Sequence, residues 1–580
     1  MAAGKHQPDS TSTSSSTSNG AEIALVGASS VAFGFLFSYP ILPHLRDFNT
    51  FWDWDFIRVL AWVPWKTVTS FHQFPVWNPY LCGGIPMLGD PQASFFTPLF
   101  LLHLIFGPIV GLHLEIPVHL AIGWAGGYVL ARVLRLGTLA AITCATIFPS
   151  SSWLFLHMTV GHHIFLPATY WPWVLAATLL ALERRSLAMA SVAGLLMALI
   201  FLEGAPYQES YAVLLVAAIL LPIGLVRRDA WPFVVFGTIL IFAAGFAAVK
   251  LIPTYAFVAL HSRPAYWREH VLPSHIAIAL FDRNQEWNHY GIADWGFFEA
   301  GAYLSPFFFI LVLIGAIARR RDAWPWMLAG AIMLGLAMGN FAPFAPWTLL
   351  RHLPIYSSER VAIRLLVPFI LCAGVLAAYS VEFLSQWKRP STMALAGLLI
   401  IAGAIDSLAV GPHNLANIQT YEEPPVSAAQ AFTQFRNPDE NEFTLKMLRF
   451  NRANIGMLHC YEFTDIPTNA VGYNEPGYEG EQHLTGRGEV SPLQWTPNAL
   501  TYQVEAPEPT TLVINQNYDR GWRLVRGAGR VVPHDGLLAI ELPAGHQQLK
   551  VMNLGDGIMA GALISLATAI VALVLWRKRL

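Results

Sequence analysis

Residues 231–252 read WPFVVFGTILIFAAGFAAVKLI, an apolar run with a single charged residue, Lys250, near its end. A helix needs roughly 20 apolar residues to cross a bilayer, and this run is long enough. Arg227 and Arg228 stand shortly before it. Because cytoplasmic loops collect Lys and Arg, the run predicts a membrane span that begins on the cytoplasmic side.

The composition of the whole chain is also typical of a membrane protein. Of 580 residues, 54% are hydrophobic and only 12% are charged, whereas soluble domains have about 45–50% and about 25%. The sequence therefore predicts a polytopic α-helical membrane protein. The formal net charge of −2 lacks the basic excess of a nucleic-acid-binding protein, so that class is excluded.

Further apolar runs and basic clusters give a topology with about twelve transmembrane helices. The predicted spans are 22–42, 115–133, 137–156, 163–182, 187–203, 207–226, 231–252, 301–318, 324–345, 361–383, 391–409 and 557–576. Every second loop is basic, at Arg132/Arg135, Arg184/Arg185, Arg227/Arg228, Arg319/Arg320/Arg321, Lys388/Arg389 and Arg577/Lys578/Arg579. The apolar segment 95–112 would reverse this alternation if it crossed, so we expect it to be a re-entrant or interfacial piece.

Four regions follow from this map. Residues 1–21 are rich in Ser and Thr and predict a disordered cytoplasmic tail. Residues 22–409 form the multi-span domain, with a long first outer loop at 43–114. Residues 410–556 alternate in short strands such as TYQVEA and GLLAIEL, which predict an extracytoplasmic β-sandwich-like domain. Residues 557–580 form the last span and a basic cytoplasmic tail.

The four cysteines are scattered singly and form no CxxC pair. Cys82 and Cys460 could meet on the outer face, but isolated thiols are the expected state because sequence does not show proximity.

Two acids, Asp53 and Asp55, stand in FWDWDFIRVL, shortly after the first span. In an extended segment both carboxylates point to one side, where they could bind a divalent metal or one could act as a base. The alternative is a solvated interfacial turn anchored by its tryptophans.

Several outer residues could contact an anionic ligand. Lys250 and Arg364 lie at membrane depth, where a cation either binds a lipid phosphate or extends its side chain to the headgroups. Arg360 is close by in sequence. His162 and His163 are adjacent, so they cannot both point the same way. One of them could be a metal ligand or a phosphate donor, or the pair could cap a helix.

Several motifs together resemble a known family. They are Asp55 followed by FIRVLAWVPW, the 74–108 segment FPVWNPYLCGGIPMLGDPQASFFTPLFLLHLIFGP, GHH at 161–163, LEG at 202–204, ERVAIR at 359–364, NQNYDRGWRLV at 515–525 and DGLLAIELPAGHQQLKV at 535–551. With the early outer acid and the outer soluble domain, the chain resembles the GT-C superfamily of membrane glycosyltransferases and, within it, the bacterial YfhO-like membrane proteins.

The resemblance implies an enzyme of the plasma (inner) membrane whose active site faces outward. It would pass a sugar from a polyprenyl-phosphate-linked donor to a cell-envelope glycan, lipid or protein. Asp55 would be the general base with Asp53 in support, while Lys250, Arg360, Arg364 and His162 would bind the donor phosphate.

The second outer loop lacks the acid that many metal-using members of this superfamily carry there. It offers only His157, His162 and His163. Asp53, Asp55 and His163 could therefore hold Mn, Mg or Zn, and imidazole favours zinc or manganese over magnesium.

In the β-domain, Tyr518 and Trp522 could bind the acceptor, or they could be core residues. Two other functions stay open: a transporter or flippase of lipid-linked sugars, and a non-catalytic scaffold that presents the β-domain.

Overall fold

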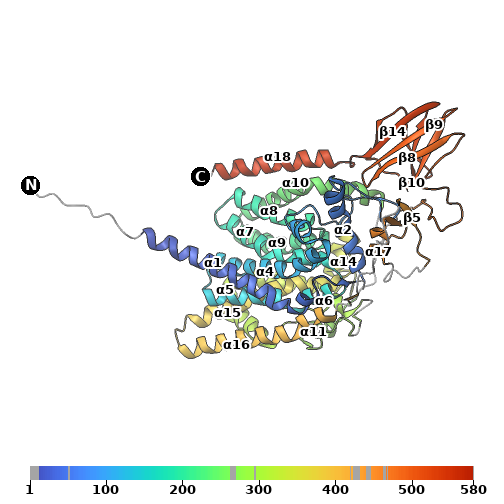
Figure 1. The fold of residues 1–580 in the computed structure, drawn as a ribbon. Helices are drawn as coiled ribbons and strands as arrows, with labels where there is room; N and C mark the ends of the chain where they lie inside the picture. The colour runs from blue at the N-terminus through green and yellow to red at the C-terminus, as the bar shows by residue number, and fades with distance from the viewer. Residues whose placement is uncertain are drawn as a thin grey trace, which may run out of the picture.

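The computed structural model describes residues 12–49, 52–261, 270–289, 291–292, 295–353, 355–417, 420–421, 431–438, 446–460, 466 and 468–578. Arg263, Arg268 and Asp294 lie outside these ranges. Within them, a helical bundle carries a β-domain at one end, and the first and last helices, α1 (Ser12–Phe37) and α18 (Ile558–Arg577), extend toward the other end (Figure 1). A multi-pass helical membrane protein with a C-terminal β-domain is therefore confirmed as the fold class.

Nine helical segments in the described chain are long and apolar enough to cross a membrane. They comprise α1 (Ser12–Phe37), α4 (Pro108–Val133), α5 (Thr138–Ser150) with α6 (Ser152–Thr159), η2 (His163–Tyr170) with α7 (Trp171–Glu183), α9 (Pro206–Arg227), α10 (Trp231–Leu260), η5 (Ala362–Leu365) with α15 (Leu366–Ser385), α16 (Pro390–Val410) with η6 (Pro412–Asn417), and α18 (Ile558–Arg577).

Three further predicted spans fall on helices that do not meet this criterion. These are the shorter helices α8 (Leu187–Leu202) and α12 (Pro306–Ala318), and α13 (Arg320–Ala337), which begins with charged residues. The predicted count of about twelve is therefore not confirmed, although each predicted segment overlaps a helix. Helix α1 also begins at Ser12, inside the segment 1–21 that was expected to be a disordered tail.

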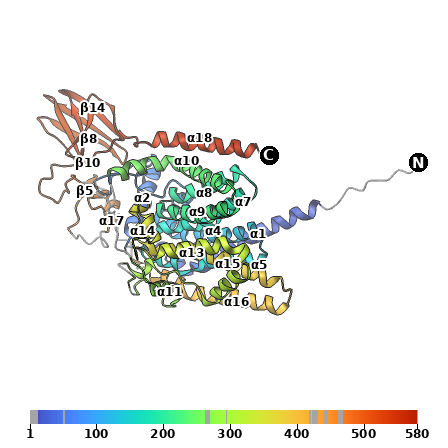
Figure 2. The same cartoon turned by 180° about the vertical axis from the view of Figure 1, so that it is seen from behind.

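The basic loops gather at one end of the bundle, as the alternation predicts. Arg132, in the last turn of α4, pairs with Glu22, and Arg135, just after this helix, pairs with Glu183. A cavity of about 480 Å³ at the same end is lined by basic residues of three helix junctions: Arg135, Arg227, and the pair Arg319 and Arg321. In both views α10 and α18 run side by side from this end toward the β-domain (Figures 1 and 2).

The apolar segment 95–112 is not a separate span. It contains α3 (Phe100–Phe106), a helix of 7 residues that is too short to cross a bilayer. Gly107 then turns the chain with φ 85°, and α4 starts at Pro108, where a proline suits the first helical turn. The segment is therefore broken at Gly107, between α3 and α4.

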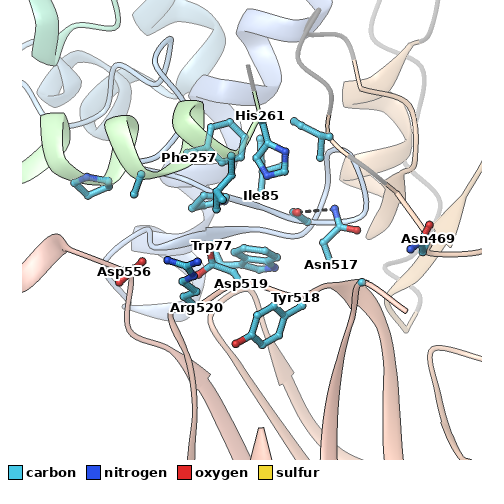
Figure 3. Close-up of a pocket in the computed structure, with 17 residues that line it drawn as sticks. Trp77, Ile85, Phe257, His261, Asn469, Asn517, Tyr518, Asp519, Arg520 and Asp556 are labelled. Atoms are coloured by element: carbon cyan, nitrogen blue, oxygen red, sulfur yellow. Dashed lines mark hydrogen bonds between the residues drawn. The ribbon is translucent and has the colours of Figure 1, made fainter. Parts of the chain in front are cut away.

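The first loop folds into α2 (Trp54–Phe71) and a hairpin of β2 (Trp77–Asn78) and β3 (Ile85–Pro86). Both faces of the first half of α2 are buried, so it packs inside the protein. The hairpin docks on the β-domain: Trp77 lies between them (Figure 3) and its indole N–H donates to the side-chain Oε1 of Gln516 at 2.9 Å.

The β-domain consists of two four-stranded antiparallel sheets that share one core. One sheet has the order β12-β13-β10-β7 and the other β11-β14-β9-β8. The strands are β7 (Gln482–Leu484), β8 (Glu489–Thr496), β9 (Ala499–Ala506), β10 (Thr510–Asn517), β11 (Trp522–Arg526), β12 (Arg530–His534), β13 (Leu537–Leu542) and β14 (Gly545–Asn553).

The segment before these sheets docks on the first loop. It contains β5 (Thr433–Phe435), α17 (Met447–Arg452) and β6 (Ile455–Met457). Asn451 Nδ2 donates to the Tyr80 carbonyl at 3.2 Å, and Met457 N–H donates to the same carbonyl at 3.0 Å. A disulfide joins Cys82 to Cys460, so the expectation of isolated thiols at these positions is wrong.

Candidate active site

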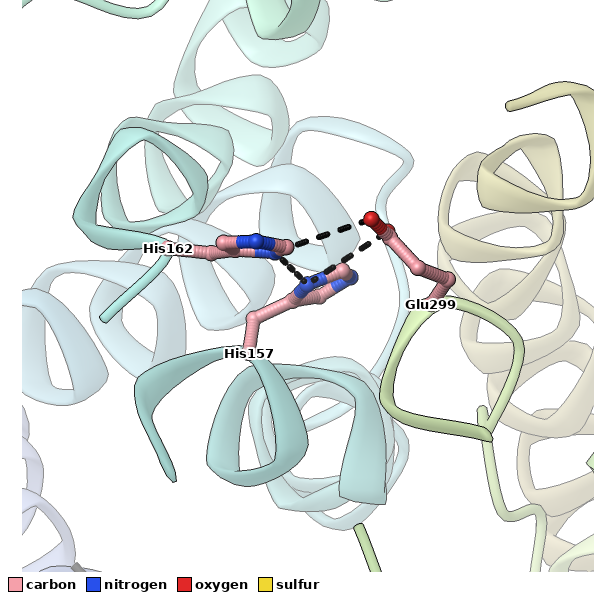
Figure 4. A group of neighbouring side chains, drawn as sticks. All are labelled: His157, His162 and Glu299. Atoms are coloured by element: carbon pink, nitrogen blue, oxygen red, sulfur yellow. Dashed lines mark hydrogen bonds and ion pairs between the residues drawn. The ribbon is translucent and has the colours of Figure 1, made fainter. Parts of the chain in front are cut away.

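Three side chains from distant parts of the sequence form a compact cluster (Figure 4). His157 lies in the last turn of α6, His162 caps η2, and Glu299 ends η3 (Phe297–Glu299). The two Nδ1 atoms of the histidines are 2.9 Å apart, and each lies 3.9 Å from an oxygen of Glu299. The described residues hold one group of three potential metal ligands this close together, and it is this one.

Arg364 completes the cluster from η5. Its Nε and Nη2 donate to the two oxygens of Glu299 at 2.7 and 2.6 Å, a two-pronged ion pair. Burial tends to raise the pKa of Glu299, but Arg364, His162 and Arg360 outweigh burial, and the pKa lies below its ordinary value. Glu299 is therefore an anion at neutral pH. Two of the predicted phosphate-binding arginines, Arg360 and Arg364, thus face one carboxylate.

Asp53 reaches the cluster from the first loop. Its carboxylate is 3.5 Å from Nε2 of His162, and its side chain is 28% exposed, more than Glu299 or His162. The loop is held there because Asp53 N–H donates to the Val160 carbonyl at 3.1 Å. Gly161, with φ 84°, permits the contact: a Cβ there would lie 2.3 Å from the nitrogen of Trp54.

Asp55 is only two residues away but points elsewhere. Its Oδ2 accepts from Met447 N–H at 2.6 Å, at the start of α17, and its Oδ1 accepts from Arg58 Nη2 at 3.2 Å. Burial raises the pKa of Asp55, and Arg58 and the α17 amides offset this only in part. Because α17 and Arg58 use this buried carboxylate, the predicted roles of Asp55 as base and metal ligand do not fit the structure.

Lys250 is buried and structural. Its Nζ donates to the carbonyls of Pro91, Ala93 and Phe201 at 3.0, 2.6 and 3.1 Å. These three bonds use all the N–H groups of an ammonium and tie the first loop to the end of α8. The phosphate contact predicted for Lys250 therefore does not fit, because binding would break this tie.

His163 points away from the cluster, as expected for the neighbour of His162. Its Nε2 lies 3.1 Å from Glu115, which also accepts from His103 at 2.7 Å. The predicted metal set of Asp53, Asp55 and His163 is thus not brought together.

The two aromatic residues predicted to bind acceptor differ in burial. Trp522 is 1% exposed and packs edge-on against Trp77, with ring centroids 5.5 Å apart, so it is a core residue. Tyr518 is half-buried and lines a cavity between the β-domain and α10. Only Tyr518 is placed to contact a ligand.

His157 and Glu299 were not predicted as site residues. Glu299 shared its loop with Asp282, Glu286 and Asp294, and nothing distinguished it except its setting in FFEAGAY, directly before an apolar run. An acid at the edge of a span is the signal that could have found it.

The donor set of this cluster fits a divalent transition metal. Two imidazoles and a carboxylate suit zinc or manganese better than magnesium. Asp53 lies beside Nε2 of His162, and a carboxylate there leaves Nδ1 as the ligand atom. His157, His162 and Glu299 would hold the ion, with Asp53 orienting His162.

No protein-family model matches the sequence, and no curated protein matches it. The solved structures that are similar to it include the following two. The arabinofuranosyltransferase AftD from Mycobacteria shares 17% identity over 70% of this chain and 27% of its own, with a TM-score of 0.37. The Archaeoglobus fulgidus oligosaccharyltransferase, solved as a complex with Zn and sulfate, shares 13% over 75% of this chain and 62% of its own, with a TM-score of 0.40. The chain spans less than two thirds of either protein, and at these scores neither likeness assigns it a function.

Proposed function

We propose that this protein is a GT-C-type glycosyltransferase that moves a sugar from a polyprenyl-phosphate-linked donor to a cell-envelope acceptor. One observation carries the proposal: Asp53, His157, His162, Glu299 and Arg364 come together at the end of the bundle that bears the β-domain. The sequence motifs that resemble GT-C enzymes support it. We place this end on the extracytoplasmic side of the plasma membrane, because the basic loops lie at the other end.

The roles of the acids follow from their surroundings. Asp53 is partly exposed, so it can accept a proton from an acceptor hydroxyl, whereas the oxygens of Asp55 are already used. We therefore assign the general-base role to Asp53. A metal held by His157, His162 and Glu299 would supply Lewis acidity toward a phosphate oxygen.

Arg364 and Arg360 are the cations for the leaving phosphate. Arg364 is held by Glu299 and lies over the ring of Phe165, 5.1 Å from its centroid. A guanidinium fixed in this way is pre-organised to stabilise charge that builds on a departing phosphate.

Mass spectrometry of cell-envelope glycans and polyprenyl-phosphate sugars tests the proposal, in cells with and without the protein. Cells that lack it should accumulate a lipid-linked sugar and lose one glycan modification. Wild-type protein should restore the modification, whereas Asp53→Asn should restore less than about 1% of it, since a positioned base contributes about 10²–10⁴-fold.

Asp47→Asn is the matched control. Asp47 lies in the same loop and pairs with His44 at 2.7 Å, outside the cluster. It should behave as wild type. Unchanged glycans without the protein, or full restoration by Asp53→Asn, would contradict the proposal and favour a scaffold.

A further inference from the structure

A second site lies outside the cluster, where the hairpin, α10 and the β-domain meet. The cavity there has a volume of about 350 Å³, which is within the range of about 300–1,000 Å³ for ligand pockets. Figure 3 shows Phe257 and His261, at the C-terminal end of α10, on one wall of the cavity. Tyr518, Asp519 and Arg520 of the β-domain lie on the opposite wall.

The walls are held in place by contacts that do not depend on a ligand. Asn498 Oδ1 accepts from Trp77 N–H at 3.0 Å, and Asn517 N–H donates to the Gly83 carbonyl at 2.8 Å. The disulfide from Cys82 adds a covalent tie. Since these contacts fix the hairpin against the β-domain, the cavity is pre-formed.

Asn517 lines this cavity, and the hairpin holds its side-chain amide in place. Its Nδ2 donates to the carbonyls of Cys82 and Gly84 at 2.5 and 3.0 Å, which fixes the orientation of the amide. The side-chain Oδ1 has no hydrogen-bond partner in the structure, although Asn517 is only 7% exposed. Because Oδ1 has almost no accessible surface, the polar groups open to a ligand are those of other lining residues, among them Asn469, Tyr518 and Arg520.

The charges that line the cavity favour a neutral ligand over an anion. Asp519 and Asp556 offset Arg520 and His261, so the described lining has no positive excess. Burial raises the pKa of Asp519, and Asp556 raises it further. The lining offers both hydrogen-bond donors and acceptors beside the rings of Tyr518 and Phe257.

We propose that this cavity binds an uncharged mono- or disaccharide unit, either of a soluble glycan or of a glycolipid headgroup. The basis is its pre-formed shape, its amide and aromatic lining and its balanced charges. Under the proposed function, this unit belongs to the acceptor. Saccharide binding at this cavity does not depend on the proposed function; only the identification of the saccharide as part of the acceptor rests on it.

Binding is tested on the full-length protein in phosphatidylcholine nanodiscs by saturation-transfer NMR. The probes are methyl glycosides of glucose, galactose, mannose, arabinose and N-acetylglucosamine. We expect at least one to bind wild type. Ala256→Trp, which fills the cavity from α10, should weaken binding at least about tenfold. Ala259→Trp, at an exposed position on the same helix that does not line the cavity, should bind as wild type.

A competition experiment distinguishes the two possible sources of the saccharide. If a monoglycosyl diacylglycerol in the nanodisc displaces the glycoside, the source is a glycolipid; if it does not, the source is a soluble glycan. The inference is overturned if no glycoside binds, if Ala256→Trp binds as wild type, or if inorganic phosphate displaces the glycoside.

Asp53→Asn separates this inference from the proposed function. It should bind the glycoside as wild type does. If binding holds while cells with and without the protein have identical glycans and lipid-linked sugars, the proposed function fails and the saccharide site stands.

Discussion

Arg364 and Glu299 illustrate how strongly single residues depend on each other in this site. Both are nearly buried, with side chains 11% and 5% exposed, and two hydrogen bonds join them. Removal of one partner from a buried ion pair costs about 3–5 kcal/mol, because the other charge is left uncompensated. Arg364→Met should therefore lower the free energy of unfolding by about this amount.

A double-mutant cycle checks this prediction by intrinsic-fluorescence thermal unfolding in detergent. Glu299→Gln with Arg364→Met should be less destabilised than the sum of the two single variants, since no unpaired charge remains. If the two effects simply add, the residues are not coupled, and the site is not organised around this ion pair.

The site residues could be predicted from the sequence only in part. Asp53, His162 and Arg364 were identified because charged or imidazole groups near span ends are unusual. Asp55 and Lys250 met the same criterion, yet they serve α17 and the first loop. Residue type and membrane depth show that a group needs a partner, but the sequence does not show whether that partner is the ligand or the protein.

At the scale of elements, Asp55 connects two helices that are far apart in sequence. It lies in the first turn of α2 and accepts from the first amides of α17. Asp55→Ala should remove this cap, which costs about 1 kcal/mol, and leave Arg58 buried without its carboxylate, which costs about 3–5 kcal/mol.

Hydrogen exchange followed by mass spectrometry checks this prediction. Amides of residues 447–452 should exchange faster in Asp55→Ala, while the strands of the sandwich keep their protection. Asp47→Ala is the control and should leave α17 protected. Unchanged exchange at α17 would show that Asp55 does not hold this helix.

The positions of the apolar helices were predictable because they depend on the length of the apolar run. The breaks within these helices could not be predicted in this way. The predicted span 137–156 divides at Ser151, after Pro149, and the predicted span 163–182 begins as a 3₁₀ helix that contains Pro167. These irregular turns place His157 and His162 face to face. A hydropathy window averages over such turns. The irregular segments that carry His157 and His162 were therefore the hardest to predict from the sequence.

At the scale of the whole molecule, the largest difference from the sequence prediction is how the first loop and the β-domain join. Cys82 and Cys460 are 378 residues apart in sequence. Trp77, from the first loop, belongs to the core of the sandwich. Contacts at such separations have no local pattern, so the sequence predicted a helical membrane protein with a C-terminal β-region but not the packing of the first loop against that region.

Glu481 lies where the segment that docks on the first loop meets the β-sandwich, and it should make the stability of the assembly depend on pH. It accepts from Gln434 N–H at 2.8 Å in the docking segment and from Asn515 Nδ2 at 3.4 Å in β10. Burial raises its pKa from the ordinary 4.5 to about 7 despite these donors. The folded state therefore holds a proton that the unfolded chain releases between these two values.

The sign of the effect follows from this difference in proton uptake. The contribution of Glu481 is most favourable below pH 4.5 and is lost as pH rises to about 7. The loss is about 3 kcal/mol, at 1.36 kcal/mol per pKa unit. Glu481→Gln stays neutral, so thermal unfolding should show a stability advantage over wild type at pH 8 that shrinks toward pH 5. Glu505→Gln, at an exposed position in β9, should track wild type at both values. An advantage of Glu481→Gln that is equal at pH 5 and pH 8 would mean that this carboxyl does not titrate at the junction, and that the docking of the two domains is set by packing alone.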